Sequence, residues 1–180
     1  MTDAPTSERG FTETRWFNAP RDLVFQAWTD PRHLGWFFNP SMPHPAEPIE
    51  VDLRVGGAWR QRMIVDDSTQ YITGGIYREI VPGERLVFTW GAVGGWPELA
   101  GDALNDAPLV TLQFTELDGG TEMFFSVTLP AHLESEQVRE WLGTGMREGW
   151  GVTLDRVKPA FADPQASAAT YTSATTSSAT

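Results

Sequence analysis

Apolar positions in the last part of the chain recur at helical spacing. Residues 135–161 carry large apolar side chains at steps of three or four, namely Val138, Leu142, Met146, Trp150, Leu154, Val157 and Phe161. This period is typical of a helix that buries one face. The pattern therefore predicts one long helix over 135–161 that packs its apolar face on the rest of the protein.

Glycines interrupt this predicted helix at Gly143, Gly145, Gly149 and Gly151. Each glycine inside a helix costs about 1 kcal/mol relative to alanine, so the helix requires a close packing partner. Trp141, Gly145 and Gly149 form a second stripe at four-residue steps, where the missing side chains leave a groove. Two alternatives are open for this groove: another backbone fills it, or a ligand does.

The stretch before this helix alternates between apolar and polar residues in the manner of β-strands separated by turns. The predicted strands cover 11–17, 49–55, 58–65, 69–81, 85–90, 109–117 and 121–129. Two short helices are expected after the first strand. One begins at Pro20, with Asn18 as a candidate cap, and the other covers 31–38.

Two glycine pairs predict where the sheet turns and bends. Gly56-Gly57 indicates a hairpin turn, and Gly74-Gly75 indicates a bulge or a strong bend. A helix of about 25 residues spans roughly 37 Å, and a strand of ten residues spans roughly 33 Å. One helix can therefore lie across the whole sheet. The predicted fold is α+β, with a curved antiparallel sheet of about six to seven strands around a long C-terminal helix.

Composition and charge narrow the classes of function. The 180 residues predict a single domain over 10–161, with a flexible lead at 1–9 and a disordered Ala/Ser/Thr tail at 162–180. The chain has no cysteine, and its three histidines lack metal-ligand spacing, so neither a metal nor a cofactor is predicted. The net charge of −11 disfavours nucleic acid as a partner. No apolar run is long enough to span a membrane, and a cytoplasmic location is expected.

Candidate cavity residues follow from the two faces of the predicted strands. In strand 58–65 the inward set is Trp59, Gln61, Met63 and Val65, with Arg60 and Arg62 outward. In strand 69–81 the residues that share one face are Tyr71, Thr73, Gly75 and Tyr77. Tyr77 is a candidate to place a hydroxyl group in the cavity, and the alternative is a packed ring with its hydroxyl satisfied locally.

Tryptophans complete the predicted cavity. Trp96 lies in the glycine-rich connection 91–108, whose length is typical of functional loops. Its ring either closes over a ligand or anchors the loop. The predicted lining is Trp28, Trp59, Gln61, Met63, Tyr71, Tyr77, Trp90, Trp96, Trp141, Gly145, Met146, Gly149 and Trp150. No catalytic residue is predicted.

Short motifs follow one another in a characteristic order between residues 11 and 161. They are Ala19-Pro20, Val24-Phe25, Ala27-Trp28-Thr29-Asp30-Pro31, Asp52-Leu53-Arg54-Val55-Gly56-Gly57, Trp59, Gly75-Ile76-Tyr77-Arg78-Glu79-Ile80-Val81-Pro82, Glu84-Arg85-Leu86-Val87-Phe88-Thr89, Gly145-Met146 and Gly149-Trp150. In combination they resemble the helix-grip fold of the START and birch-pollen-allergen superfamily. Within it, the chain resembles the family named for the activator of heat shock protein 90 ATPase. The resemblance implies a hydrophobic ligand cavity or a protein-binding module.

Three hypotheses of function remain open. The first is a non-enzymatic module that binds a small hydrophobic or aromatic molecule between sheet and helix. The second is a cyclase-like or hydrolase-like enzyme that uses the same cavity with Tyr77 or Gln61. The third is a module that interacts with a chaperone, as the family name suggests. A homodimer is also an open alternative. An open cavity favours the first two hypotheses, whereas a closed core with an exposed apolar patch favours the third.

Overall fold

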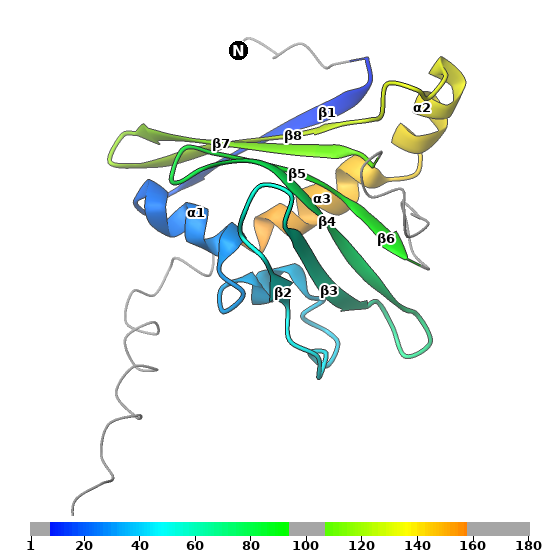
Figure 1. Cartoon of the computed structure of the whole chain (residues 1–180), viewed down its shortest axis with the longest axis horizontal. Coiled ribbons are helices and arrows are strands. Elements are labelled where there is room, and N and C mark those ends of the chain that lie inside the picture. The colour runs from blue at the N-terminus through cyan, green and yellow to red at the C-terminus, as the bar shows by residue number, and fades with distance from the viewer. Residues whose placement is uncertain (1–7, 94–106, 158–180) are drawn as a thin grey trace, which may run out of the picture.

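The protein is described by a computed structural model over residues 8–93 and 107–157, and its sheet curves around one helix (Figure 1). The strands are β1 (Gly10–Phe17), β2 (Glu50–Val51), β3 (Ala58–Ile64), β4 (Gln70–Val81), β5 (Arg85–Thr89), β6 (Gly91–Val93), β7 (Leu109–Leu117) and β8 (Gly120–Thr128). The helices are α1 (Arg21–Thr29), the 3₁₀ helix η1 (Leu34–Phe37), α2 (Ser135–Leu142) and α3 (Met146–Asp155).

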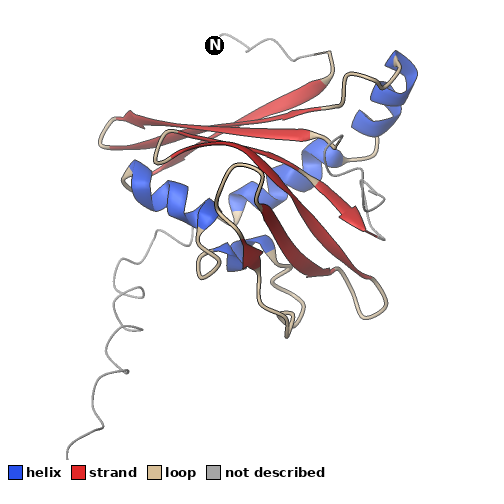
Figure 2. Ribbon diagram, viewed as in Figure 1, coloured by secondary structure: helices blue, strands red, loops and turns tan. Residues whose placement is uncertain are grey.

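All strand pairs of this sheet are antiparallel. Their order is β1-β8-β7-β5-β4-β3-β2, and β6 pairs with β4 beside this path. The helices α1 and α3 lie on the concave side of the sheet, and α2 lies near one end (Figure 2). This architecture confirms the predicted α+β helix-grip fold.

The prediction of one uninterrupted C-terminal helix is wrong. The segment forms α2 and α3, which are separated by residues 143–145. Gly145 is the N-cap of α3 and has a φ of 89°, a left-handed conformation that glycine adopts without steric cost. Gly143 and Gly145 therefore end one helix and begin the next, and only Gly149 and Gly151 lie inside a helix.

Four local predictions also change. The strand expected at 49–55 is only Glu50–Val51, because a turn follows in which the Arg54 N–H donates to the Asp52 carbonyl at 2.8 Å. The helix expected at 31–38 is the short 3₁₀ helix η1. Asn18 does not cap α1, whose N-cap is Pro20 with no side-chain hydrogen bond. The 91–108 segment, expected to be a connection, begins with strand β6.

The sheet changes partners near the glycine pair that predicted a bend. Strand β4 pairs with β6 over Ile72–Gly74 and with β5 from Tyr77, with an irregular register between Tyr77 and Glu79. A Cβ on Gly75 would lie 1.6 Å from the carbonyl oxygen of Thr89. Glycine is required there because the two backbones approach too closely for any side chain.

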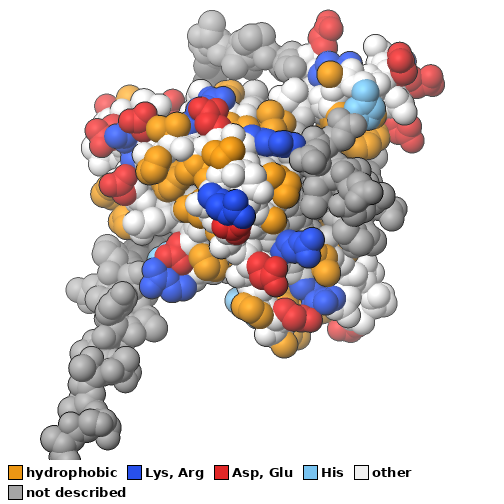
Figure 3. Space-filling view, in the orientation of Figure 1, with side chains coloured by type: hydrophobic (Ala, Val, Ile, Leu, Met, Phe, Trp, Pro, Cys, Tyr) orange, Lys and Arg blue, Asp and Glu red, His pale blue; other side chains and the backbone are white. Residues whose placement is uncertain are grey.

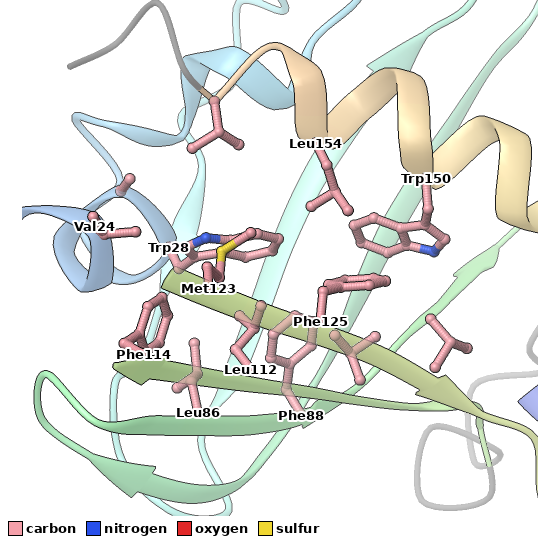
Figure 4. Packing of buried hydrophobic residues seen from close by; sticks show 14 of the residues in the cluster. Val24, Trp28, Leu86, Phe88, Leu112, Phe114, Met123, Phe125, Trp150 and Leu154 are labelled. Atoms are coloured by element: carbon pink, nitrogen blue, oxygen red, sulfur yellow. The ribbon is translucent and has the colours of Figure 1, made fainter. Parts of the chain in front are cut away.

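Aromatic and aliphatic side chains fill the space between the sheet and the helices (Figure 4). Phe88 of β5, Leu112 and Phe114 of β7, and Met123 and Phe125 of β8 lie on the inner face of the sheet. They pack against a second set from the helices, which includes Val24, Trp28, Trp150 and Leu154. The apolar helical face predicted from the sequence is buried at Val138, Met146, Trp150, Leu154 and Val157.

Ion pairs hold α3 against the edge strand β1. The Arg15 Nε donates to Asp155 Oδ1 at 2.8 Å, and the Arg147 Nε donates to Glu13 Oε1 at 2.9 Å. Arg15 also pairs with Glu13 at 3.1 Å. These contacts fix one side of α3, so that its other side faces β3 and β4.

Candidate functional site

A cavity of about 210 Å³ lies between α3, η1 and the strands β3 and β4. Its apolar lining consists of Phe37, Met63, Trp90, Met146 and Trp150, and its remaining lining consists of Tyr71, Thr73, Thr144, Gly145, Gly149 and Thr153. We call this space the larger chamber. None of the described residues that line it is charged.

The strand side of the larger chamber follows from alternation along β3 and β4. Met63 pairs with Tyr71, and Gln61 pairs with Thr73, so these four side chains share the inner face. The next pair is Trp59 with Gly75. A Cβ on Gly75 would lie 2.9 Å from the indole nitrogen of Trp59, so the glycine leaves room for this ring.

The helix side of the chamber is formed by two buried residues of α3 and by a stripe of small ones. Met146 and Trp150 are each only 4% exposed. Gly145, Gly149 and Thr153 follow at four-residue steps and line the chamber, and both glycines are exposed at its opening. A Cβ on Gly149 would meet no atom within 4 Å, so the space beside this glycine is open.

Trp150 connects the chamber to the core. Its ring lies 5.6 Å from Phe37, 5.0 Å from Trp90 and 4.8 Å from Phe125, measured between ring centroids. The contacts with Phe37 and Trp90 are edge-to-face, an arrangement that aromatic pairs prefer. The chamber wall is therefore held by the same ring that packs the core.

A second space of about 20 Å³, the smaller chamber, lies deeper in the protein. Its lining is Trp28, Leu34, Phe37, Trp59, Gln61, Tyr77 and Phe88. Phe37 lines both chambers, so its ring forms part of the wall between them.

Several buried polar atoms beside the two chambers have no hydrogen-bond partner among the described residues. They are the indole nitrogens of Trp28, Trp59 and Trp150 and the Oε1 of Gln61. The other end of the Gln61 amide contacts only the sulfur of Met63, at 3.6 Å. By contrast, Thr73 donates its hydroxyl to the Gly91 carbonyl at 2.8 Å. Burial raises the pKa of the Tyr71 and Tyr77 hydroxyls, which keeps both neutral.

Arg156 fixes the wall that η1 contributes. Its Nη1 donates to the Phe38 carbonyl at 2.6 Å, and its Nη2 donates to the Thr153 hydroxyl at 3.1 Å. Burial lowers the pKa of Arg156. This guanidinium ties the residue after Phe37 to the end of α3 and so holds two sides of the larger chamber together.

The structure brings most of the predicted cavity residues together, but divides them between two chambers. Met63, Tyr71, Trp90, Gly145, Met146, Gly149 and Trp150 line the larger chamber. Trp28, Trp59, Gln61 and Tyr77 line the smaller one. Trp141 lines neither chamber, and Trp96 lies outside the described residues. Val65 was predicted to face inward but is 43% exposed, because β3 ends at Ile64 and the chain turns there.

Six lining residues were missed from the sequence: Phe37, Thr73, Thr144 and Thr153 in the larger chamber, and Leu34 and Phe88 in the smaller one. Thr73 was placed on the inward face by alternation, and only its role in the lining was missed. Of the two alternatives for the glycine groove, filling by another backbone is wrong at Gly149, which borders open space. Close approaches of backbones lie within the sheet, as at Gly75.

In the part of the chain that the structure describes, no three or more histidine, aspartate or glutamate side chains gather in a way that would hold a metal ion. Within the same residues, no helix is long and apolar enough to cross a membrane.

Solved structures with the same fold come from several bacteria. Protein Ms6760 from Mycobacterium smegmatis is 26% identical, with a TM-score of 0.68 over 88% of this chain and 95% of that chain. A protein from Arthrobacter aurescens is 22% identical, with a TM-score of 0.70 over 90% and 91%. Protein NE0264 from Nitrosomonas europaea is 20% identical, with a TM-score of 0.68 over 90% and 99%. The latter two are similar in fold alone.

A family model also matches most of the chain. The model described as activator of Hsp90 ATPase homolog 1-like protein matches residues 18–162. This range contains every residue of both chambers. No protein with a curated function matches the chain.

Proposed function

Because the chain belongs to the family of activator of Hsp90 ATPase homolog 1-like proteins, we propose that it binds a small apolar or aromatic molecule in the larger chamber. The observation that carries this proposal is an open space of about 210 Å³, lined by aromatic rings and thioethers, at the junction of α3 with β3 and β4. Ligand sites are commonly concave and apolar, with a few polar groups that orient the ligand.

The volume of the larger chamber limits the size of the ligand. Ligand pockets typically measure about 300–1,000 Å³, and an apolar cavity of about 150 Å³ admits benzene. A chamber of about 210 Å³ therefore suits a molecule of one or two rings rather than a sterol or a lipid chain. Gly145 and Gly149 have no side chains and that of Thr153 is small, which leaves an entry to the larger chamber beside α3.

The lining favours binding over catalysis. An enzyme in this cavity would need a group that transfers protons, and none of the described lining residues is charged. Tyr77 and Gln61 were the candidates for this role. Burial raises the pKa of the Tyr77 hydroxyl and makes its anion less accessible, and the Gln61 side chain is an amide that does not titrate. The open chamber also favours a small ligand over a chaperone partner. On the face shown in Figure 3, charged side chains interrupt the hydrophobic ones.

A cavity-filling substitution tests the proposal. Isothermal titration calorimetry would measure the binding of mono- and bicyclic aromatics, with naphthalene as the reference probe. Gly149→Leu fills the open space at the chamber mouth and is expected to weaken naphthalene binding at least tenfold. Val152→Leu is the matched control, because Val152 lies on the same helix, is 64% exposed and does not line the chamber.

Two outcomes would contradict the proposal. One is that none of the aromatic probes binds the wild-type protein. The other is that naphthalene binds Gly149→Leu as tightly as it binds the wild type and Val152→Leu, because the ligand would then lie elsewhere.

A further inference from the structure

Side chains that line the smaller chamber carry buried polar atoms that have no hydrogen-bond partner among the described residues. We propose that the ligand carries one neutral hydroxyl group, and that this group enters the smaller chamber while the ring system occupies the larger one. This inference rests on the proposed function and specifies the class of ligand as a hydroxylated aromatic, such as a phenol or a naphthol.

Three residues that line the smaller chamber carry an unpaired donor or acceptor. Trp28 and Trp59 each contribute an indole N–H without a partner, and Gln61 contributes an Oε1 without one. Gln61 is only 3% exposed, so bulk solvent reaches little of its side chain. Buried polar groups are rarely left unpaired, and each such exception calls for a specific partner.

A hydroxyl group can pair with a buried donor and a buried acceptor at the same time. Its oxygen accepts a hydrogen bond from an indole N–H, and its hydrogen is donated to a carbonyl oxygen such as that of Gln61. An ether oxygen only accepts, and a methyl group does neither. The Gln61 amide nitrogen faces the Met63 sulfur, and its Oε1 is the end that remains without a partner.

Size and charge restrict the group further. The smaller chamber measures about 20 Å³, and a polar cavity of about 10–15 Å³ holds one water molecule. A single oxygen atom with its hydrogen fits this space, whereas a carboxylate has two oxygens. Moreover, none of the described lining residues carries a charge that would balance an ionised ligand.

Phe37 joins the two halves of the proposed site. Its ring lines both chambers and lies 6.1 Å from the Trp59 ring and 5.6 Å from the Trp150 ring. The proposal requires a rotation of this side chain that opens the smaller chamber toward the larger one. The Arg156 contact to the Phe38 carbonyl ties the backbone next to Phe37 to the end of α3.

A series of naphthalene derivatives tests the inference with the wild-type protein. Calorimetry would compare naphthalene, 2-naphthol and 2-methoxynaphthalene, which share a ring system and differ in one group. We expect 2-naphthol to bind about tenfold more tightly than naphthalene, because it satisfies a buried donor and a buried acceptor at once. We expect 2-methoxynaphthalene to bind no more tightly than naphthalene, because it cannot donate and its methyl group exceeds the smaller chamber.

A matched pair of variants identifies the acceptor. Gln61→Leu is expected to abolish the preference for 2-naphthol over naphthalene. Gln113→Leu makes the same change at an exposed position of β7 and is expected to retain the preference. Circular dichroism would verify that both variants fold. If Gln61→Leu does not fold, the ligand series on the wild type still tests the inference.

The outcomes separate this inference from the proposed function. If naphthalene and 2-naphthol bind with equal affinity, or if Gln61→Leu folds and retains the full preference, the hydroxyl site is refuted while the ligand cavity stands. If none of the three compounds binds, the proposed function fails together with the inference.

Discussion

Replacing Gly149 with alanine is expected to stabilise the protein, which is unusual for a substitution beside a binding site. Gly149 lies inside α3, where glycine costs about 0.5–1 kcal/mol relative to alanine. The added methyl group would meet no atom within 4 Å, so no steric term opposes this gain. The expected increase in the free energy of unfolding is therefore about 0.5–1 kcal/mol.

Urea denaturation followed by tryptophan fluorescence would measure this effect as a higher midpoint concentration. A gain of 1 kcal/mol corresponds to a rise in melting temperature of about 2–4 °C for a domain of this size. Gly75→Ala is the opposite control, because its Cβ would lie 1.6 Å from the Thr89 carbonyl oxygen. Forcing a methyl group against backbone is expected to cost about 3 kcal/mol.

The reasoning fails if Gly149→Ala lowers the midpoint. A loss of stability would mean that another part of the protein occupies the space beside Gly149, and the open chamber mouth would then not exist. If Gly75→Ala had no effect, the close approach of β4 and β5 would likewise be refuted.

Further predictions concern the walls and the ends of the site. Trp150→Ala removes a buried ring and is expected to lower the free energy of unfolding by about 3–5 kcal/mol in urea denaturation, and a loss below 1 kcal/mol would contradict its place in the core. Arg156→Met leaves the Phe38 carbonyl without its donor and is expected to cost about 1–2 kcal/mol by the same assay, whereas an unchanged midpoint would show that η1 is held by other contacts. The hydrogen bond from Arg32 lowers the pKa of Asp30 below its ordinary value of 3.8, so the carboxylate stabilises the folded state above that pH. Asp30→Asn should therefore destabilise the protein at pH 7, and the difference from wild type should diminish as the pH falls below 3.8 toward the folded-state pKa; a difference that stays constant over this fall in pH would refute the assignment.

Strand faces were predictable from the sequence because alternation along a strand depends on local geometry alone. The inward positions of Trp59, Gln61 and Met63 follow from this period, and the bounds of β7 agree with the predicted strand 109–117. The end of a strand depends on its turn, which explains why Val65 was assigned to the inner face and is exposed.

The helical part of the site was predicted less well, because a break in a helix resets its phase. The prediction that Trp141, Gly145 and Gly149 form one stripe assumed a continuous helix. Residues 143–145 instead separate α2 from α3. Within α3 the stripe continues from Gly149 to Thr153, whereas Trp141 belongs to α2 and leaves the chamber. The left-handed conformation of Gly145 is the physical cause, and two glycines spaced two apart were the available signal.

The role of Phe37 could not be predicted from sequence patterns. Its place between the two chambers depends on contacts with Trp59 of β3 and Trp150 of α3, which are far away in the chain. The unpaired amide of Gln61 is similar in this respect, because hydrogen-bond partners of a buried group are known only once the fold is known.

The most direct test of the ligand cavity is a titration of the ¹⁵N-labelled protein with naphthalene, observed at the indole N–H signals. We expect a saturable shift of the Trp150 signal, because this ring lines the larger chamber. The signal of Trp16 should not move, because this residue is 44% exposed on β1 and donates to the Leu117 carbonyl outside both chambers. A titration in which Trp150 remains unchanged, or in which Trp16 shifts equally without saturation, would contradict the cavity as the binding site.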